Sequence, residues 1–303
     1  MTLPFGVISF DELIQHLINT LSLGSTYALL ALGLAMVFSI LGLVNFAHGE
    51  LVTVAGYTFY LLSEQDVPFL LQIPAALLAS AIVAVLMERL AFRPLRGARF
   101  VTLLFASFAL SVIIQNLFLA LVSARQKGVP FPDQFNGFFT IGGFTFSNLQ
   151  VITAATCIVA LLVLTLFLRR SISGLGMLAA AQDFQVARLM GIPANRVIAM
   201  AFAISGLLAG IAAIFIVANR GTVEPAMGFT PVLKAFIASV IGGLGSLSGA
   251  VLGGFVLAFI EVALEVTLPD GALPFRDAFA LLAVIVILYF KPQGLLRRRE
   301  ERT

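Results

Sequence analysis

Three side chains capable of polar chemistry lie within six residues of one another in an apolar part of the sequence. The segment VNFAHGE (44–50) supplies an amide at Asn45, an imidazole at His48 and a carboxylate at Glu50, with apolar sequence on both sides. Such groups are costly in membrane hydrocarbon unless they face protein or water, so they mark functional sites there. We therefore predict that Asn45, His48 and Glu50 line or gate a pathway for a solute.

The same three residues do not form a metal or catalytic site. One imidazole and one carboxylate two residues apart are too few ligands for a metal ion, and no nucleophile is paired with His48 as an enzyme would need. We assign no catalytic residue and no metal ligand. For His48, a structural or gating role is favoured over direct contact with substrate, and both remain open.

The backbone around this segment is predicted to interrupt a helix. Gly42 and Gly49 flank the polar residues and permit conformations outside the helical region. Transporters commonly place a discontinuous helix near the middle of the membrane. We expect the break to fall between residues 45 and 50.

The composition identifies an integral membrane protein. Of 303 residues, 60% are hydrophobic and 11% are charged, against about 25% charged in soluble domains. The apolar runs are long and continuous, which favours helices over barrel strands. We predict an all-α, polytopic helical bundle that forms a single transmembrane domain over 1–303. The net charge of +3 is explained by loop arginines, so nucleic acid is not an expected partner.

The apolar runs predict about eight membrane spans, with seven to ten allowed. The run 51–62 is short and suits a half-helix. The run 232–267 is long, and glycines 242, 243, 245 and 249 interrupt it. We assign Gly242, Gly243, Gly245 and Gly249 to a tight turn and to close helix packing. The runs fall at 13–44, 51–62, 68–88, 100–124, 150–168, 198–218, 232–267 and 278–290.

Basic residues predict the orientation in the membrane. Cytoplasmic loops carry an excess of Lys and Arg, and most of these residues fall into three clusters. With all three clusters in the cytoplasm, loops 125–149 and 219–231 lie outside and the C-terminus lies inside. The Phe-rich loop 125–149 is expected to fold back as a cap or short hairpin. The clusters are Arg89, Arg93, Arg96 and Arg99; Arg169, Arg170, Arg188 and Arg196; and Lys291, Arg297, Arg298, Arg299 and Arg302.

The cytoplasmic loop 169–197 contains a predicted helix over 178–193. Its composition is rich in good helix formers, and Gly191 followed by Pro193 is a stop signal. One face of this helix is partly apolar. It either lies on the membrane surface or docks a soluble partner, and the residues alone favour neither.

Two acidic residues late in the chain, Glu261 and Glu265, lie one helical turn apart. In a proton-coupled transporter such residues relay protons. Because Pro269 follows shortly, we favour a position at the outer interface of the membrane.

The order of these motifs resembles the permease subunits of branched-chain (hydrophobic) amino acid ABC transporters, of the type that carries the asparagine-phenylalanine-alanine-histidine-glycine motif. The resemblance extends from about Leu13 to Gly294 and rests on VNFAHGE, on GGLGSLSGAVLGG (242–254) and on the cytoplasmic loop. In that loop the family pattern is met by Ala181, Asp183, Ala187 and Gly191, whereas Gln182 stands where an acidic residue is more usual.

The resemblance implies a permease that moves branched-chain or other small hydrophobic amino acids inward by alternating access. It implies a second permease subunit (a homo- or heterodimer), two cytosolic ATPases and an extracytoplasmic substrate-binding protein. The chain would lie in a bacterial or archaeal cytoplasmic (inner) membrane. The ATPases would dock on the 178–193 helix, with coupling assigned to Ala181, Asp183, Ala187, Arg188 and Gly191.

The chain has no G-x-x-x-x-G-K-[ST] phosphate loop, so ATP and Mg²⁺ are expected on the partner ATPases and no cofactor on this chain. It is expected not to be an enzyme. An importer for urea, short amides or another small solute is the alternative within the family. An ion-coupled secondary transporter is the alternative from another class.

Overall fold

The computed structural model describes residues 10–132, 135, 137–141 and 144–296. Parts of the loop 125–149 and the basic residues Arg297, Arg298, Arg299 and Arg302 lie outside the described residues. The predictions that depend on these four arginines therefore rest on the sequence alone.

Long apolar helices make up most of the described chain, which confirms the predicted all-α membrane bundle. Seven described helices are long and apolar enough to cross a membrane, within the predicted range of seven to ten. The π-turn η1 (Glu88–Phe92) extends α3, and the 3-10 turn η3 (Leu273–Phe275) precedes α11. The seven helices long enough to span a membrane are α1 (Phe10–Leu41), α3 (Phe69–Met87), α4 (Phe100–Leu121), α5 (Asn148–Arg170), α8 (Ala194–Arg220), α10 (Leu247–Thr267) and α11 (Arg276–Phe290).

Four shorter helices accompany the spanning helices, and one of them, α2, explains why eight apolar runs give seven spanning helices. Residues 51–62 belong to the short helix α2, and the run 232–267 is divided into α9 and α10 at its glycines. The first apolar run is one helix, α1. The shorter helices are α2 (His48–Ser63), α6 (Ile172–Gln182), α7 (Phe184–Leu189) and α9 (Phe229–Gly242).

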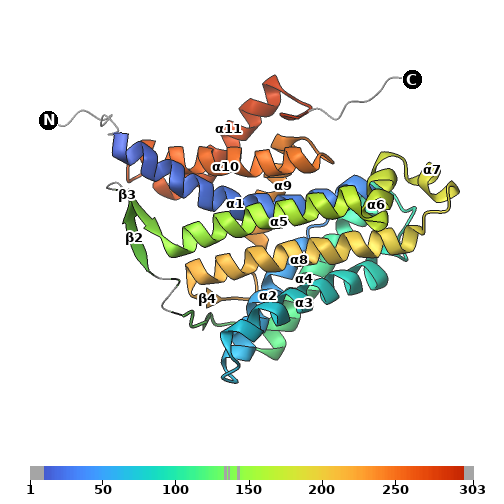
Figure 1. Ribbon diagram of the computed structural model, residues 1–303, viewed down its shortest axis with the longest axis horizontal. Helices are drawn as coiled ribbons and strands as arrows, with labels where there is room; N and C mark the ends of the chain where they lie inside the picture. Colours follow the sequence, from blue (N-terminus) through green and yellow to red (C-terminus); the bar gives the residue numbers. More distant parts are fainter. Residues whose placement is uncertain (1–9, 133–134, 136, 142–143, 297–303) are drawn as a thin grey trace.

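Short strands define one end of the bundle. Strands β2 (Phe138–Ile141) and β3 (Phe144–Ser147) form an antiparallel hairpin, as expected for the Phe-rich loop. Strand β1 (Lys127–Gly128) pairs with β4 (Thr222–Val223), so the two loops predicted to lie outside meet at the same end. We call this the hairpin end, and the opposite end, which carries α6 and α7, the α7 end (Figure 1).

The centre of the bundle is formed by α1 and α8, which are mostly buried, whereas α4 and α11 are largely exposed. Small residues allow the close packing. The Ser80 hydroxyl of α3 lies 2.8 Å from the carbonyl oxygen of Gly206 in α8 and 3.1 Å from that of Leu51 in α2. These contacts hold three helices around the short helix α2.

Candidate functional site

The polar segment 44–50 forms a return loop in the interior of the bundle. Gly42, with φ of +65°, ends α1, and the chain turns back until His48 lies beside Gly33 of the same helix. A Cβ added to Gly33 would lie 2.9 Å from the His48 ring. Helix α2 begins at His48, so the predicted break is present and the next helix starts inside the bundle.

The start of α9 meets the start of α2. A Cβ added to Gly49 would lie 2.3 Å from the Gly228 carbonyl oxygen, and one added to Gly228 would lie 1.9 Å from the Gly49 carbonyl oxygen. From this contact α2 runs to the hairpin end, where Gly56 touches Val223 of β4. Helix α9 runs the other way, to a turn beside α10. We call the Gly49–Gly228 contact the half-helix junction.

The segment that opposes the first chain break precedes α9, at Gly228, and is separate from the glycine turn at 242–249. Both short helices direct their N-termini, which carry partial positive charge, toward the junction.

The three predicted pathway residues are brought to this junction and are all buried. The Nδ1 atom of His48 lies 3.1 Å from the Ser205 hydroxyl of α8. Oxygen Oε1 of Glu50 accepts hydrogen bonds of 2.7 Å from both Ser111 and Gln115 of α4. Glu50 lies in the first turn of α2, where the helix dipole favours a carboxylate. The residues therefore connect the junction to two spanning helices.

Aromatic rings close the junction on its α4 side. The ring of Phe46 stacks on Phe108 of α4 with centroids 4.4 Å apart and lies 5.5 Å from Phe236 of α9. The Phe46 amide donates to the Ser107 hydroxyl at 3.3 Å. Phe46 is therefore packed between α4 and α9, next to the buried polar residues.

The predicted helix over 178–193 is two helices rather than one. Asp183 has an extended backbone, and its Oδ1 accepts 2.9 Å hydrogen bonds from the amides of Gln185 and Val186. An aspartate that caps a helix N-terminus favours a new start over continuation, so the chain divides into α6 and α7. Gly191, with φ of +85°, follows the end of α7.

Helix α7 presents apolar side chains at its end of the bundle. Leu189 and Met190 are 85% and 79% exposed, whereas Ala187 is buried. Of the other residues assigned to coupling, Ala181 is partly buried and Arg188 is exposed.

A cavity of about 970 Å³ adjoins α7 and is lined by Arg96, Arg188 and Ile192, among other residues. Arg96 pairs with Glu88 and donates to the Asn195 side chain, which ties the loop after α3 to the start of α8. The α7 end thus offers a groove with basic and apolar walls.

The glycines of 242–249 lie in a turn where backbones meet. A Cβ on Gly242 would lie 1.9 Å from the Gly249 carbonyl oxygen. Gly243 and Gly245 have φ of +105° and +84°, which favour glycine. The amide of Leu295 donates to the Ile241 carbonyl oxygen at 2.7 Å, so the chain after α11 packs on this turn.

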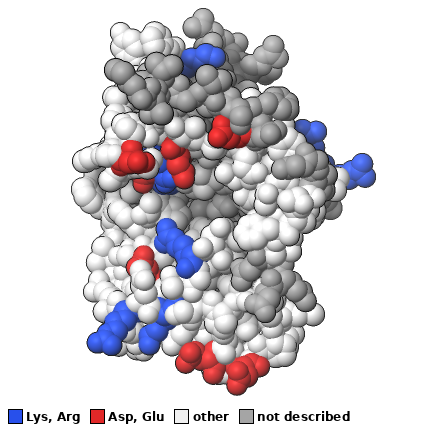
Figure 2. All heavy atoms as spheres, turned by 90° about the vertical axis from the view of Figure 1, so that its left-hand side faces the viewer, with Lys and Arg blue, Asp and Glu red and all other residues white. Residues whose placement is uncertain are grey.

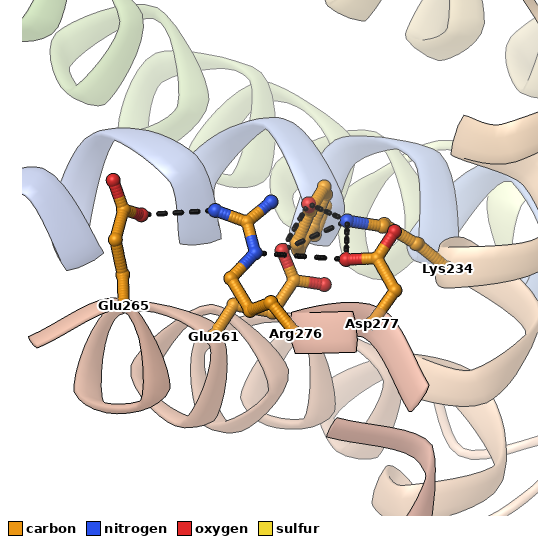
Figure 3. Close-up of polar contacts among 6 residues, drawn as sticks. Lys234, Glu261, Glu265, Arg276 and Asp277 are labelled. Carbon is orange, nitrogen blue, oxygen red and sulfur yellow. Dashed lines mark hydrogen bonds and ion pairs between the residues drawn. The ribbon is translucent and has the colours of Figure 1, made fainter. Parts of the chain in front are cut away.

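A charged network that the sequence did not predict lies between α1, α9, α10 and α11 (Figure 3). The Lys234 ammonium lies 2.9 Å from Glu261, 3.1 Å from the Tyr27 hydroxyl and 3.4 Å from Asp277. Tyr27 donates to Glu261 at 2.8 Å. We call these four residues the ion-pair network. Its signal in the sequence was Lys234, the single cation in the apolar run 232–267.

The two acidic residues of α10 differ in environment. The Glu261 side chain is only 2% exposed and pairs with Lys234, so it packs inside the bundle, and its predicted position at the outer interface of the membrane stays a prediction. The Glu265 side chain is 60% exposed and lies 2.9 Å from Arg276.

A second cavity, of about 440 Å³, lies beside the ion-pair network toward the hairpin end. Its wall includes Lys234, Arg220 and Glu265. The space-filling view onto this end shows basic and acidic side chains together on one face (Figure 2). Among the described residues, no group of three His, Cys, Asp or Glu side chains is placed to hold a metal ion.

Comparison with known proteins gives a family match over most of the chain. The family model described as "Branched-chain amino acid transport system / permease component" matches residues 16–289. No solved structure matches the chain.

Two relatives match over nearly their full length and a third over two thirds of its length. The high-affinity branched-chain amino acid transport system permease protein BraD of Pseudomonas aeruginosa is 33% identical, with 95% of this chain and 96% of that protein covered. The corresponding LivH protein of Escherichia coli is 32% identical, with 96% and 97% covered. The LivM protein of Salmonella typhimurium is 28% identical, with 89% and 67% covered.

Proposed function

Because the chain belongs to the family of branched-chain amino acid transport permease components, we propose that it is a permease subunit of an ATP-binding-cassette importer. Its cargo is a branched-chain or other small hydrophobic amino acid. The family match over residues 16–289 carries this proposal, and the near-complete overlap with two relatives of that description supports it. The chain is a multi-pass membrane protein and performs transport without covalent chemistry.

The orientation follows from the basic residues. The α7 end carries Arg96, Arg169 and Arg188, and an excess of such residues favours the cytoplasm. The hairpin end then faces outward, toward a substrate-binding protein, and the C-terminus lies inside. A bacterial or archaeal cytoplasmic membrane fits this arrangement.

The exposed helices favour a second permease subunit. Helices α4 and α11 are largely exposed and apolar, which suits either lipid or another permease. The chain matches two differently named permease proteins, LivH and LivM, so we propose a partner of similar fold, either a copy of this chain or a related one.

Helix α7 is the proposed contact for the cytosolic ATPases. Its exposed Leu189 and Met190 and the adjacent groove offer a surface that a soluble domain can bury. Asp183 and Gly191 fix the two ends of α7, so a push on this helix is transmitted to α6 and α8 and then to the bundle. ATP and Mg²⁺ are held by the partner subunits.

Replacing Gly191 with valine should uncouple ATP hydrolysis from transport. No atom lies within 4 Å of the added Cβ, so the cost is backbone strain of about 1–2 kcal/mol at a left-handed position. We expect uptake to fall several-fold while membrane insertion is retained. Gly191→Asn is the matched control, because asparagine tolerates this conformation. Equal uptake by the valine, asparagine and parent proteins would exclude this role.

The half-helix junction is the proposed gate of the pathway. Asn45 is buried in the present conformation, so alternating access requires that it become exposed in another state. In a Cys157→Ala background, Asn45→Cys should resist a membrane-impermeant maleimide in one nucleotide state and react in another. Gln65→Cys, at an exposed loop position, should react in every state. Protection of position 45 in all nucleotide states would remove the junction from the pathway.

The substrate is tested through the ATPases. In the reconstituted complex with its binding protein, L-leucine, L-isoleucine or L-valine should stimulate ATP hydrolysis. Urea and short amides, the alternative cargo in this family, should leave the rate at its basal level. Stimulation by urea alone would replace the proposed substrate, and no ligand response in an intact complex would contradict the proposed function.

A further inference from the structure

The cavity toward the hairpin end has the contents of a small-molecule site. Its volume of about 440 Å³ falls within the range of about 300–1,000 Å³ that is usual for such sites. Its lining carries both signs of charge: Arg220 and Lys234 are positive, and Glu265 is negative. A ligand with one positive and one negative group would find a partner for each.

Arg220 is the cation available to a ligand. The Lys234 ammonium has three donors, and they are matched by Glu261, Tyr27 and Asp277. Among the described residues Arg220 makes one ion pair, at 3.9 Å with Glu224, and its side chain is 43% exposed. A guanidinium with so weak a partner can bind a carboxylate through two parallel hydrogen bonds.

Glu265 is the matching anion. Its Oε2 accepts from Arg276 at 2.9 Å, and a carboxylate has a second oxygen and further lone pairs to offer. With 60% of its side chain exposed, Glu265 can receive an ammonium group without the burial of an unpaired charge.

The remaining wall of the cavity suits an aliphatic side chain. Leu23 of α1, Ile216 of α8 and Val262 of α10 line the same space as Arg220 and Glu265. Burial of aliphatic carbon against these residues is favourable by about 25 cal/mol for each Å² of apolar surface removed from water.

We propose that this cavity binds an α-amino acid zwitterion with a branched aliphatic side chain on its way into the membrane. Arg220 holds the carboxylate, Glu265 holds the ammonium, and Leu23, Ile216 and Val262 contact the side chain. Tyr27 and Lys234 of the ion-pair network also line the site. This inference rests on the proposed function, because it names a substrate site within the importer.

The test is equilibrium binding of radiolabelled L-leucine to the complete transporter in lipid nanodiscs, without the binding protein. L-Leucinol lacks the carboxylate and 4-methylpentanoate lacks the ammonium, so neither should compete. Arg220→Gln and Glu265→Gln should each weaken binding at least about tenfold, because each removes the charge from a charge-assisted contact with the ligand. Arg125→Gln is the control, since this exposed residue at the same end does not line the cavity. Elution of each variant complex at the position of the parent complex in size-exclusion chromatography shows that it is folded and assembled.

Three results would overturn the inference. The first is equal leucine affinity of the parent and both variants, and the second is absence of leucine binding to a parent complex that transports leucine. The third is a loss of the variants' affinity for the substrate-binding protein with no change in their affinity for leucine. The last result would make the cavity rim a docking surface. Uptake by the parent complex with its binding protein reports on the proposed function separately, so the two failures are distinguishable.

Discussion

Replacing Gly228 with alanine should abolish transport, because the half-helix junction has no room for a side chain. The added Cβ would lie 1.9 Å from the Gly49 carbonyl oxygen and 2.9 Å from the Thr53 hydroxyl. Gly228 has φ of −81°, a value that alanine adopts freely, so the effect is steric. The helices must separate, at a cost of about 3 kcal/mol, the upper end for overpacking.

The measurement for this variant is thermal unfolding of the purified complex together with leucine uptake in proteoliposomes. Gly271→Ala is the matched control, because nothing lies within 4 Å of a Cβ at that position. We expect the control to behave as the parent protein. A Gly228→Ala complex with parental stability and uptake would show that the two helix starts are not in contact.

Replacing Lys234 with methionine should destabilise the bundle more than any surface charge substitution. The change leaves Glu261, only 2% exposed, without its cation among α1, α9 and α10. Removing one partner of a buried ion pair costs about 3–5 kcal/mol. The double variant Lys234→Met/Glu261→Met should recover much of this loss, because no unpaired charge is left buried.

A double-mutant cycle measures this coupling through the unfolding free energies of the parent, the two single variants and the double variant. Arg276→Met provides the comparison, since the side chains of Arg276 and Glu265 are 32% and 60% exposed and such a pair is expected to contribute about 0–1 kcal/mol. If Lys234→Met costs no more than Arg276→Met, the ion pair with Glu261 does not stabilise the bundle.

Elements that depend on local pattern were predictable from the sequence. The spanning helices follow the apolar runs, and the return loop at 44–50 follows from polar residues beside Gly42 and Gly49. The hairpin in 125–149 follows from a Phe-rich loop that water would not solvate. In each case the structure is decided by whether the residue is favourably placed in lipid or in water.

Elements that depend on contacts between distant segments were not predictable. The contact of Gly49 with Gly228, the pairing of β1 with β4, and the ion pair of Lys234 with Glu261 each join residues far apart in the chain. The sequence before α9, Glu224 to Gly228, resembles an ordinary loop, so nothing in it indicated a second half-helix start opposite the first. Asp183 is a local signal for the start of a new helix, but the strong helix formers on both sides of it led to the prediction of one continuous helix.

Uptake of radiolabelled L-leucine into proteoliposomes tests the central claim most directly. The vesicles would hold this chain with its permease and ATPase partners, with ATP enclosed and the binding protein outside. An ATP-binding-cassette importer predicts accumulation that requires both ATP and the binding protein and is unaffected by collapse of proton and sodium gradients. Leucine uptake by this chain alone, driven by an ion gradient without ATP, would contradict it and identify a secondary transporter.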